Sequence, residues 1–428
     1  MREHRSLSSD QTRSWPAGAI DQQNEDLHDG SHWVAEIPFL DVVQTAQELV
    51  RIPSVNPMGR EVTGEIYFEH RLTDYLENQW KAMGLPYERC EVFPGRDNLV
   101  TRLDGDENAE TILLEVHQDT VPVDGMTVAP FAADLRDGRI YGRGACDIKG
   151  GMASMLNAFA RLSRDAKSSR ANVVLACTIN EENGFDGAKK LRQHWQSGAS
   201  KLLPRAPDKI IVAEPTNLNV VTAHKGTIRW QCYVEGRAAH SSMPELGDNA
   251  IYRMGPILNR LETYGLQIVP SLASHPLVGK PTLSVGMIEG GISVNTVPDR
   301  CTLTIDRRLL PNESAEEAFA NLQDYLASHG LGDALIHETP FLSTPGLSDQ
   351  INGDLAESLL ETIRECGHKA DCMGVPYGTD ADTLSGGEIP AVVFGPGDIA
   401  QAHTKDEWVE TEQLKSAAEI LYRYCSRS

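Results

Sequence analysis

The chain has 428 residues, an apolar content of 40% and a formal net charge of −22 at pH 7. Its length exceeds the size at which a single hydrophobic core usually stops growing, so two domains are expected. The negative charge argues against binding to nucleic acid or to an anionic membrane surface. No stretch approaches the roughly 18 consecutive apolar residues of a membrane-spanning helix.

The first residues and the cysteines indicate where the protein works. Residues 1–35 are polar and lack the apolar core of a signal peptide, so we expect a disordered extension rather than a targeting segment. Eight cysteines are scattered without a CxxC pair, which favours reduced thiols and a cytoplasmic protein. Cys366 and Cys372 are the closest pair, but a reducing compartment argues against a disulfide between them.

From residue 39 to about residue 221, helical and strand patterns alternate. Amphipathic helices are predicted at 39–52 and 68–84. Short, continuous apolar strands and further helices then follow in turn, namely a strand at 111–116, a helix at 151–162, a strand at 172–179, a helix at 186–196 and a strand at 209–214. Apolar strands separated by helices are typical of an α/β domain with a mainly parallel sheet covered by helices on both faces.

The order of elements changes after about residue 220. The pattern becomes β-α-β-β-α-β, with predicted elements at 226–236, 248–265, 281–291, 300–309, 313–330 and near 334–338. This is the order of a small ferredoxin-like α+β domain. The first pattern returns with elements at 353–367, 390–395 and 411–425. We therefore predict that a domain of residues 222–334 is inserted into a larger domain formed by residues 36–221 and 335–428.

Several predicted strands of the larger domain end in a side chain that binds metals. His117 and Glu214 lie at two strand ends, and His403 follows a third strand. The glycine-rich loop 141–151 adds Asp147, and its glycines let the backbone approach other groups closely. Ligands of open α/β sheets bind beyond the carboxyl ends of the strands. Two histidines with several carboxylates suit Zn²⁺, Co²⁺ or Mn²⁺, and are enough for two ions that share one carboxylate.

Glu181 and Glu182 stand side by side directly after the strand 172–179. One carboxylate can bind a metal while the other moves a proton between water and a leaving group. Alternatively, one of them only caps the helix that follows. Asp119, two residues after His117, is placed to accept the other N–H of that imidazole.

These stretches, taken together, resemble the M20 family of dinuclear metallopeptidases and amidohydrolases, which includes acetylornithine deacetylase and succinyl-diaminopimelate desuccinylase. The similarity runs in family order over roughly residues 37–425 and rests on HQDTVPVDG, DGRIYGRGACDIKGGMA, INEENG, VAEPT, GRAAHSS, GGISVNTVPD, DRRLLP and GPGDIAQAHTKDEWV. The resemblance implies that the larger domain is catalytic and that the inserted domain acts as a lid and in dimerisation.

The resemblance also implies a role for individual residues. His117 and Glu214 would hold one zinc ion, Glu182 and His403 the other, and Asp147 would bridge them. Glu181 would be the general base and then the general acid, with Asp119 orienting His117.

In the inserted domain, His240 matches a histidine that stabilises the oxyanion, in some members from the neighbouring subunit. Asn295 and Arg308 match positions near the substrate carboxylate, with Arg307 a rival for Arg308. Thr379 and Asp380 resemble a loop near the substrate, together with Gly378.

The resemblance implies a hydrolase with two divalent ions, Zn²⁺ before Co²⁺ or Mn²⁺, that cleaves the amide of N-acyl amino acids and forms a homodimer. The stretch 375–403 is most similar to the deacetylase and desuccinylase branch. Dipeptidase or carboxypeptidase activity is the enzymatic alternative, and a metal-free binding homologue is the other. Val116 and His224 depart from the family pattern without removing a ligand. Cys146, which precedes Asp147, is either a packed thiol or a further ligand.

Overall fold

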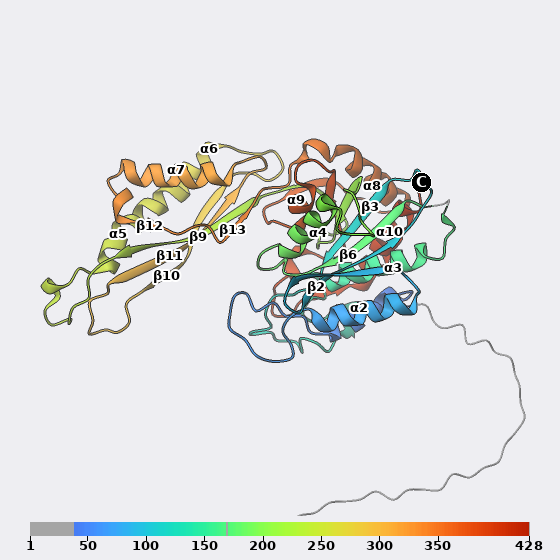
Figure 1. Ribbon diagram of the computed structural model, residues 1–428, viewed down its shortest axis with the longest axis horizontal. Helices are drawn as coiled ribbons and strands as arrows, with labels where there is room; N and C mark the ends of the chain where they lie inside the picture. Colours follow the sequence, from blue (N-terminus) through green and yellow to red (C-terminus); the bar gives the residue numbers. More distant parts are fainter. Residues whose placement is uncertain (1–37, 168–169, 428) are drawn as a thin grey trace, which may run out of the picture. The chain divides into compact units, whose positions relative to one another are not determined.

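A computed structural model describes residues 38–167 and 170–427. The predicted extension, residues 1–35, lies outside this range. Within it, the larger sheet has eight strands in the order β1-β2-β6-β3-β7-β15-β8-β14. Figure 1 labels β2, β6 and β3 of this sheet. Their bounds are β1 (Tyr87–Phe93), β2 (Arg96–Leu103), β3 (Thr111–His117), β6 (Asn172–Thr178), β7 (Lys209–Val212), β8 (Val220–His224), β14 (Cys372–Val375) and β15 (Ala391–Val393). The central strands β6, β3, β7 and β15 are parallel to one another.

Helices cover both faces of this sheet, as predicted. One face packs against α1 (Val42–Arg51), α2 (His70–Ala82), α3 (Lys149–Leu162), α8 (Gly353–Glu365) and α10 (Thr411–Cys425). The other face packs against α4 (Asp186–Ser197) and α9 (Asp380–Ser385). Alternate residues of β3 point to opposite faces: Leu114 belongs to the first core and Leu113 to the second. Both are fully buried, which explains why this strand is apolar without alternation.

The smaller sheet is formed by β9 (Gly226–Glu235), β10 (Thr282–Gly290), β11 (Arg300–Leu309), β12 (Ile336–His337) and β13 (Leu342–Thr344). Its order β10-β11-β9-β12 and antiparallel pairing are those of a ferredoxin-like sheet, which confirms the predicted fold class. Helices α5 (Ala250–Thr263) and α7 (Ala315–Ser328) complete a separate apolar core, and a short helix α6 (Val269–Leu272) follows α5. Both β12 and β13 lie after residue 334 in the sequence, yet they pair with β9 of the smaller sheet. The domain boundaries at 222 and 334 therefore stay a prediction.

Several strands were not predicted from the sequence. The hairpin of β1 and β2 turns at Pro94 and Gly95; β8 and β14, at the other edge of the larger sheet, are four or five residues long. A third sheet of β4 (Asp134–Arg136), β5 (Arg139–Tyr141) and β16 (Trp408–Glu410) was missed as well. It places the segment before β16 beside the loop that follows β5.

All eight cysteines are free. Among the residues that the structure describes, none of the helices is long and apolar enough to cross a membrane.

Candidate metal centre

The carboxyl ends of three parallel strands bring the first ligand candidates together. His117 ends β3 and lies opposite Thr178, the last residue of the neighbouring strand β6. On the other side, β7 pairs with β3 in parallel, and Glu214 follows β7 by two residues. After β6, Asn180 adopts a left-handed conformation with φ 63°, and its carbonyl accepts hydrogen bonds from Gly184 and Phe185. This tight turn keeps the glutamate pair at the sheet edge.

The structure gathers all five predicted metal ligands and Glu181 into two groups that could hold metal ions. In each group the candidate ligand atoms lie within 4.8 Å of one another; the first contains His117, Glu181 and Glu214, and the second Asp147, Glu182 and His403. The Nε2 atom of His117 is 3.9 Å from Oε1 of Glu214, and Nε2 of His403 is 3.2 Å from Oε2 of Glu182.

Asp147 links the two groups with one carboxylate oxygen each. Its Oδ1 atom lies 3.2 Å from Nε2 of His117, and its Oδ2 atom lies 3.2 Å from Nε2 of His403. Both His117 Nε2 and Asp147 Oδ1 are buried without a hydrogen-bond partner within the described part of the chain. Such atoms are costly unless something else binds them. Two divalent ions that share Asp147 fit this donor set of imidazole nitrogens and carboxylate oxygens.

The charges at this edge also favour bound cations. Burial, together with the neighbouring carboxylates, raises the pKa values of Glu181 and Glu214 well above their usual range and that of Glu182 to about 7. Burial alone would lower the pKa of His117, but nearby carboxylates outweigh it and raise that pKa well above its usual range. The carboxylates of Asp147 and Glu182 raise the pKa of His403 to about 10. Positive ions would relieve this repulsion among the buried carboxylates.

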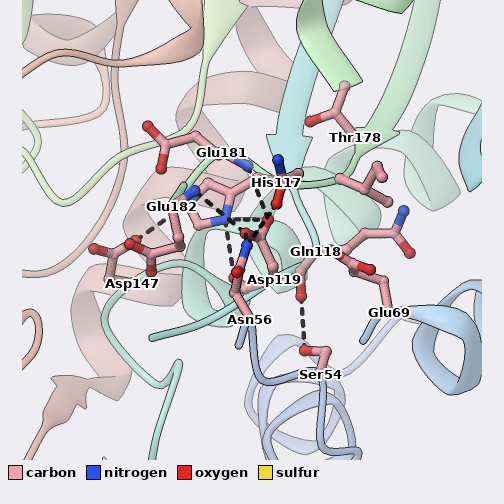
Figure 2. A network of polar contacts seen from close by, with 12 residues as sticks. Ser54, Asn56, Glu69, His117, Gln118, Asp119, Asp147, Thr178, Glu181 and Glu182 are labelled. Carbon is pink, nitrogen blue, oxygen red and sulfur yellow. Dashed lines mark hydrogen bonds and ion pairs between the residues drawn. The ribbon is translucent and has the colours of Figure 1, made fainter. Parts of the chain in front are cut away.

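Asp119 organises the residues around the first group (Figure 2). The Nδ1 atom of His117 lies 3.0 Å from the backbone carbonyl of Asp119 and 3.6 Å from its carboxylate. The nearer acceptor for this imidazole is therefore the backbone oxygen. The carboxylate accepts hydrogen bonds from the backbone N–H groups of Glu181 (3.1 Å) and Glu182 (3.2 Å). Asp119 thus holds both the imidazole and the backbone of the glutamate pair.

A further layer of polar residues supports Asp119, and the sequence analysis missed it. The amide of Asn56 donates to Asp119 (2.8 Å) and to Asn180 (2.8 Å). Arg96 also donates to Asn180 (3.1 Å) and pairs with the fully buried Glu69. The signal that was available is the position of Asn180 directly before the glutamate pair, because asparagine tolerates the left-handed conformation of a tight turn.

The predicted substrate residues of the smaller sheet and its loops have partners near them in the sequence. His240 accepts a hydrogen bond at Nδ1 from the backbone of Ser242 (3.2 Å), and the side chain of Asn295 accepts one from Ser293 (2.7 Å). Arg308 pairs with Asp306 at 2.8 Å.

Arg307, the rival of Arg308, lies on the other face of β11. It is buried and pairs with Glu313. Residues 307 and 308 alternate in burial along this strand, so their guanidinium groups serve different sides of the sheet.

Thr379 and Asp380 are buried beside the metal-ligand groups. The hydroxyl of Thr379 accepts a hydrogen bond from Ala381 at the start of α9 (3.1 Å), and Asp380 accepts one from Thr178 at 3.3 Å. Their roles in substrate binding stay a prediction.

Three residues noted from the sequence have clear surroundings. Val116 is fully buried within the larger core. His224 is fully buried, with Nε2 3.6 Å from Asp382. Cys146 donates to the carbonyl of Asp398 (3.3 Å), and burial raises the pKa of its thiol well above the usual range. A packed thiol, rather than a thiolate ligand, fits this environment.

A family model described as "Peptidase family M20/M25/M40" matches residues 113–427. The chain belongs to this family. It is 30% identical over 366 residues to an acetylornithine deacetylase of Myxococcus xanthus, covering 82% of this chain and 90% of that protein. It is 27% identical over 394 residues to a succinyl-diaminopimelate desuccinylase of Corynebacterium glutamicum, covering 90% and 96%.

Among solved structures, an M20 family metallo-carboxypeptidase from Sulfolobus solfataricus matches with a TM-score of 0.72 and 21% identity. The match covers 90% of this chain and 98% of that one. This similarity shows that the fold is shared. With the family match and the relatives, it follows that the chain is an enzyme, a metal-dependent amidohydrolase.

Proposed function

We propose that the protein hydrolyses the amide bond of N-acyl amino acids, as a deacetylase or desuccinylase with two metal ions. The observation that carries the proposal is the placement of Asp147, whose two carboxylate oxygens each lie 3.2 Å from a different histidine. The similarity to a deacetylase and a desuccinylase over most of the chain supports the substrate class.

The chain's own residues would hold two divalent ions. His117 and Glu214 would bind one ion, Glu182 and His403 the other, and Asp147 both. Zn²⁺ is the first candidate for this set of ligands, with Co²⁺ and Mn²⁺ as alternatives. When bound, such a pair lowers the pKa of a water and polarises the substrate carbonyl.

Glu181 is the proposed general base. Its carboxylate lies in the first ligand group, and its backbone is held by Asp119. Burial raises its pKa well above the usual range, which makes the carboxylate a stronger proton acceptor. Glu181 would take a proton from the attacking water and return it to the departing amine, while its neighbour Glu182 acts as a ligand.

Residues of the inserted region would bind the rest of the substrate. Since Nδ1 of His240 accepts a hydrogen bond, a neutral ring carries its proton on Nε2, which could donate to the oxyanion. Arg308, rather than the buried Arg307, would bind the substrate carboxylate with Asn295, because its side chain is partly exposed. Thr379 and Asp380 would shape the pocket from the larger domain.

We also propose that the protein forms a homodimer through the inserted region. The edge strand β10 and the loop after it expose large apolar side chains: Met287 is 56%, Ile292 90% and Val294 103% exposed. β10 is the outermost strand of its sheet, and an exposed, apolar edge is a surface that another chain covers. Small N-acyl amino acids or short peptides are the other proposed partners.

The test is hydrolysis of a panel of N-acetyl and N-succinyl amino acids, N-acetylornithine included, alongside dipeptides. Purified protein would be assayed with Zn²⁺ or Co²⁺ and after chelation. We expect metal-dependent turnover of N-acyl amino acids in preference to dipeptides. Preference for dipeptides would instead support a dipeptidase or carboxypeptidase. Two bound ions without any turnover would contradict the substrate class, and a protein that binds no metal would contradict the whole proposal.

A further inference from the structure

Glu407 is a buried carboxylate to which neither the sequence analysis nor the proposed mechanism gives a role. Its side chain is completely buried, and it lies four residues after His403 and directly before β16. We propose that Glu407 is the positioning residue that fixes Asp147 as the ligand shared by both ions. This inference rests on the two-ion centre of the proposed function, but not on the identity of the substrate.

The carboxylate of Glu407 is fully occupied by the loop that carries Asp147. Its Oε1 atom accepts hydrogen bonds from the backbone N–H groups of Cys146 (2.9 Å) and Asp147 (3.0 Å). Its Oε2 atom accepts from the backbone of Gly144 (3.1 Å) and from the guanidinium of Arg143 (2.6 Å). Arg143 is itself buried and supplies the compensating charge. Four donors saturate the carboxylate, so Glu407 has no capacity left to bind a metal or substrate.

The glycines of this loop are needed for that arrangement. Gly142 and Gly144 have φ values of 150° and 82°, which side-chain-bearing residues rarely adopt. A Cβ on Gly142 would lie 2.6 Å from a methyl of Val50, and one on Gly144 would lie 2.8 Å from a methyl of Thr120. The close backbone approach indicated by the glycine-rich sequence is therefore an approach to Val50 and Thr120, and it leaves the N–H groups of the loop turned toward Glu407.

Glu407 also connects the loop to the second histidine. Asp147 is held through its own backbone N–H by Glu407, and His403 lies on the same segment as Glu407. Pairing of β16 with β5, which puts Val409 opposite Ile140, anchors that segment beside the loop. One short stretch thus fixes the relative position of His403 and of the carboxylate that His403 contacts. A displaced Asp147 would lose contact with one ion more readily than with both, since each of its oxygens faces a different histidine.

The variant Glu407→Gln tests this inference. A glutamine amide would replace one acceptor oxygen with an N–H₂ group, which would face two N–H donors of the loop. We expect the mutated protein to bind the weaker of the two Co²⁺ ions about 10- to 100-fold more weakly than the unmodified protein does. This is the usual effect of losing a residue that orients a ligand. The visible absorption spectrum of the fully loaded Co²⁺ protein should also change. Calorimetric titration of the metal-free protein and the spectrum provide the two readouts.

Glu410→Gln is the matched control. Glu410 ends the same strand, β16, and is partly exposed; among the described residues its carboxylate pairs with Arg139 of β5 at 3.2 Å rather than with the loop that carries Asp147. This control should bind both ions like the unmodified protein. Circular dichroism and thermal unfolding would show that each variant is folded. If Glu407→Gln does not fold, Glu407→Asp replaces it, with an intermediate affinity and a shifted spectrum expected because the shorter carboxylate keeps its charge.

Unchanged affinity for both ions and an unchanged spectrum in the folded variant would overturn the inference, even if thermal stability falls, because Glu407 would then only stabilise the loop. Failure of the proposed function is a separate result: unmodified protein that binds two Co²⁺ ions but hydrolyses no N-acyl amino acid would contradict the substrate and leave the role of Glu407 intact.

Discussion

The carboxyl edge of the larger sheet buries Asp119, Asp147 and Glu214, whereas the helix-covered face of the smaller sheet buries Trp230 and Leu303. The first set carries like charges that repel one another in a poorly solvated place. The second set is apolar and is stabilised by removal from water. The comparison teaches that the two regions have different requirements: the carboxylates at the edge of the larger sheet need positive charge beside them, whereas the core of the smaller sheet depends mainly on apolar packing.

Histidine shows the same contrast. Carboxylates raise the pKa of His403, at the metal centre, to about 10. Burial lowers the pKa of His337, in the smaller sheet, to about 4. The surroundings, rather than the residue type, decide which protonation state of a histidine is favoured.

The largest effect is expected from Glu181→Gln, which removes the base but leaves the shape of the side chain. kcat/KM should fall by about 10²- to 10⁴-fold, the usual contribution of a general base. The content of bound metal should stay at two ions per chain, measured by elemental analysis of dialysed protein. Glu182→Gln is the control, because it should lose an ion. A Glu181→Gln protein that loses an ion instead would show that this residue is a ligand.

Trp230→Ala tests how strongly the smaller sheet depends on the packing of its apolar core. Trp230 is fully buried against Phe319, with ring centroids 5.1 Å apart, and such a deletion usually costs about 3–5 kcal/mol. We expect the free energy of unfolding from denaturant titration to fall by about that amount. The Co²⁺ spectrum of the folded protein should not change. A changed spectrum would mean that the two regions are not as independent as the comparison requires.

Removing the metal should destabilise the carboxyl edge of the larger sheet and leave the smaller sheet unchanged. An ion that is present at 100 times its Kd stabilises the folded protein by about 2.7 kcal/mol for each site. Chelation removes this contribution to the free energy of unfolding. After chelation, backbone amides at the ends of β3, β6 and β7 should exchange hydrogen faster in mass-spectrometric measurements, while those of β9 and β11 keep their rates. Equal acceleration in both sheets would contradict this division.

The sequence predicted most of what depends on local pattern. Apolar runs located β3 and β6 because both faces of these strands are buried, and helical period located α3 and α10. β1 and β8 were missed. β1 is a partly exposed edge strand, and β8 is a five-residue strand that runs almost directly into β9. Neither pattern differs clearly from that of a loop or a continuing strand.

The residues of the candidate site also fall into those that the sequence predicted and those that it did not. The ligand candidates could be predicted because each follows a recognisable strand or loop, and the family resemblance supplied their roles. The supporting roles of Asn56, Arg96 and Glu407 could not be predicted, because each of these side chains contacts residues that are far away in the sequence. Glu407, for example, accepts a hydrogen bond from the backbone N–H group of Asp147, which lies 260 residues away in the sequence. Only the fold brings such residues together.

The smallest effect is expected from protonation of His337. Its Nδ1 atom accepts a hydrogen bond from the indole of Trp230 (3.1 Å), so the folded state favours the neutral ring. The pKa of about 4 in the folded protein lies below the usual value near 6.5 of an unfolded chain. Its stabilising effect is therefore present above pH 6.5 and is lost as the pH falls toward 4.

His337→Gln isolates this contribution, because glutamine can accept the same hydrogen bond but does not titrate. Denaturant unfolding of both proteins between pH 7 and 4 would give the difference in their free energies of unfolding. That difference should shift in favour of the variant as the pH falls, with a slope of less than one proton because the ring is partly exposed. The groups of the metal centre titrate in both proteins, so their contribution cancels in the difference between the two free energies of unfolding. Parallel pH profiles would show that His337 is free to take up a proton in the folded state, and that the contrast with His403 does not hold.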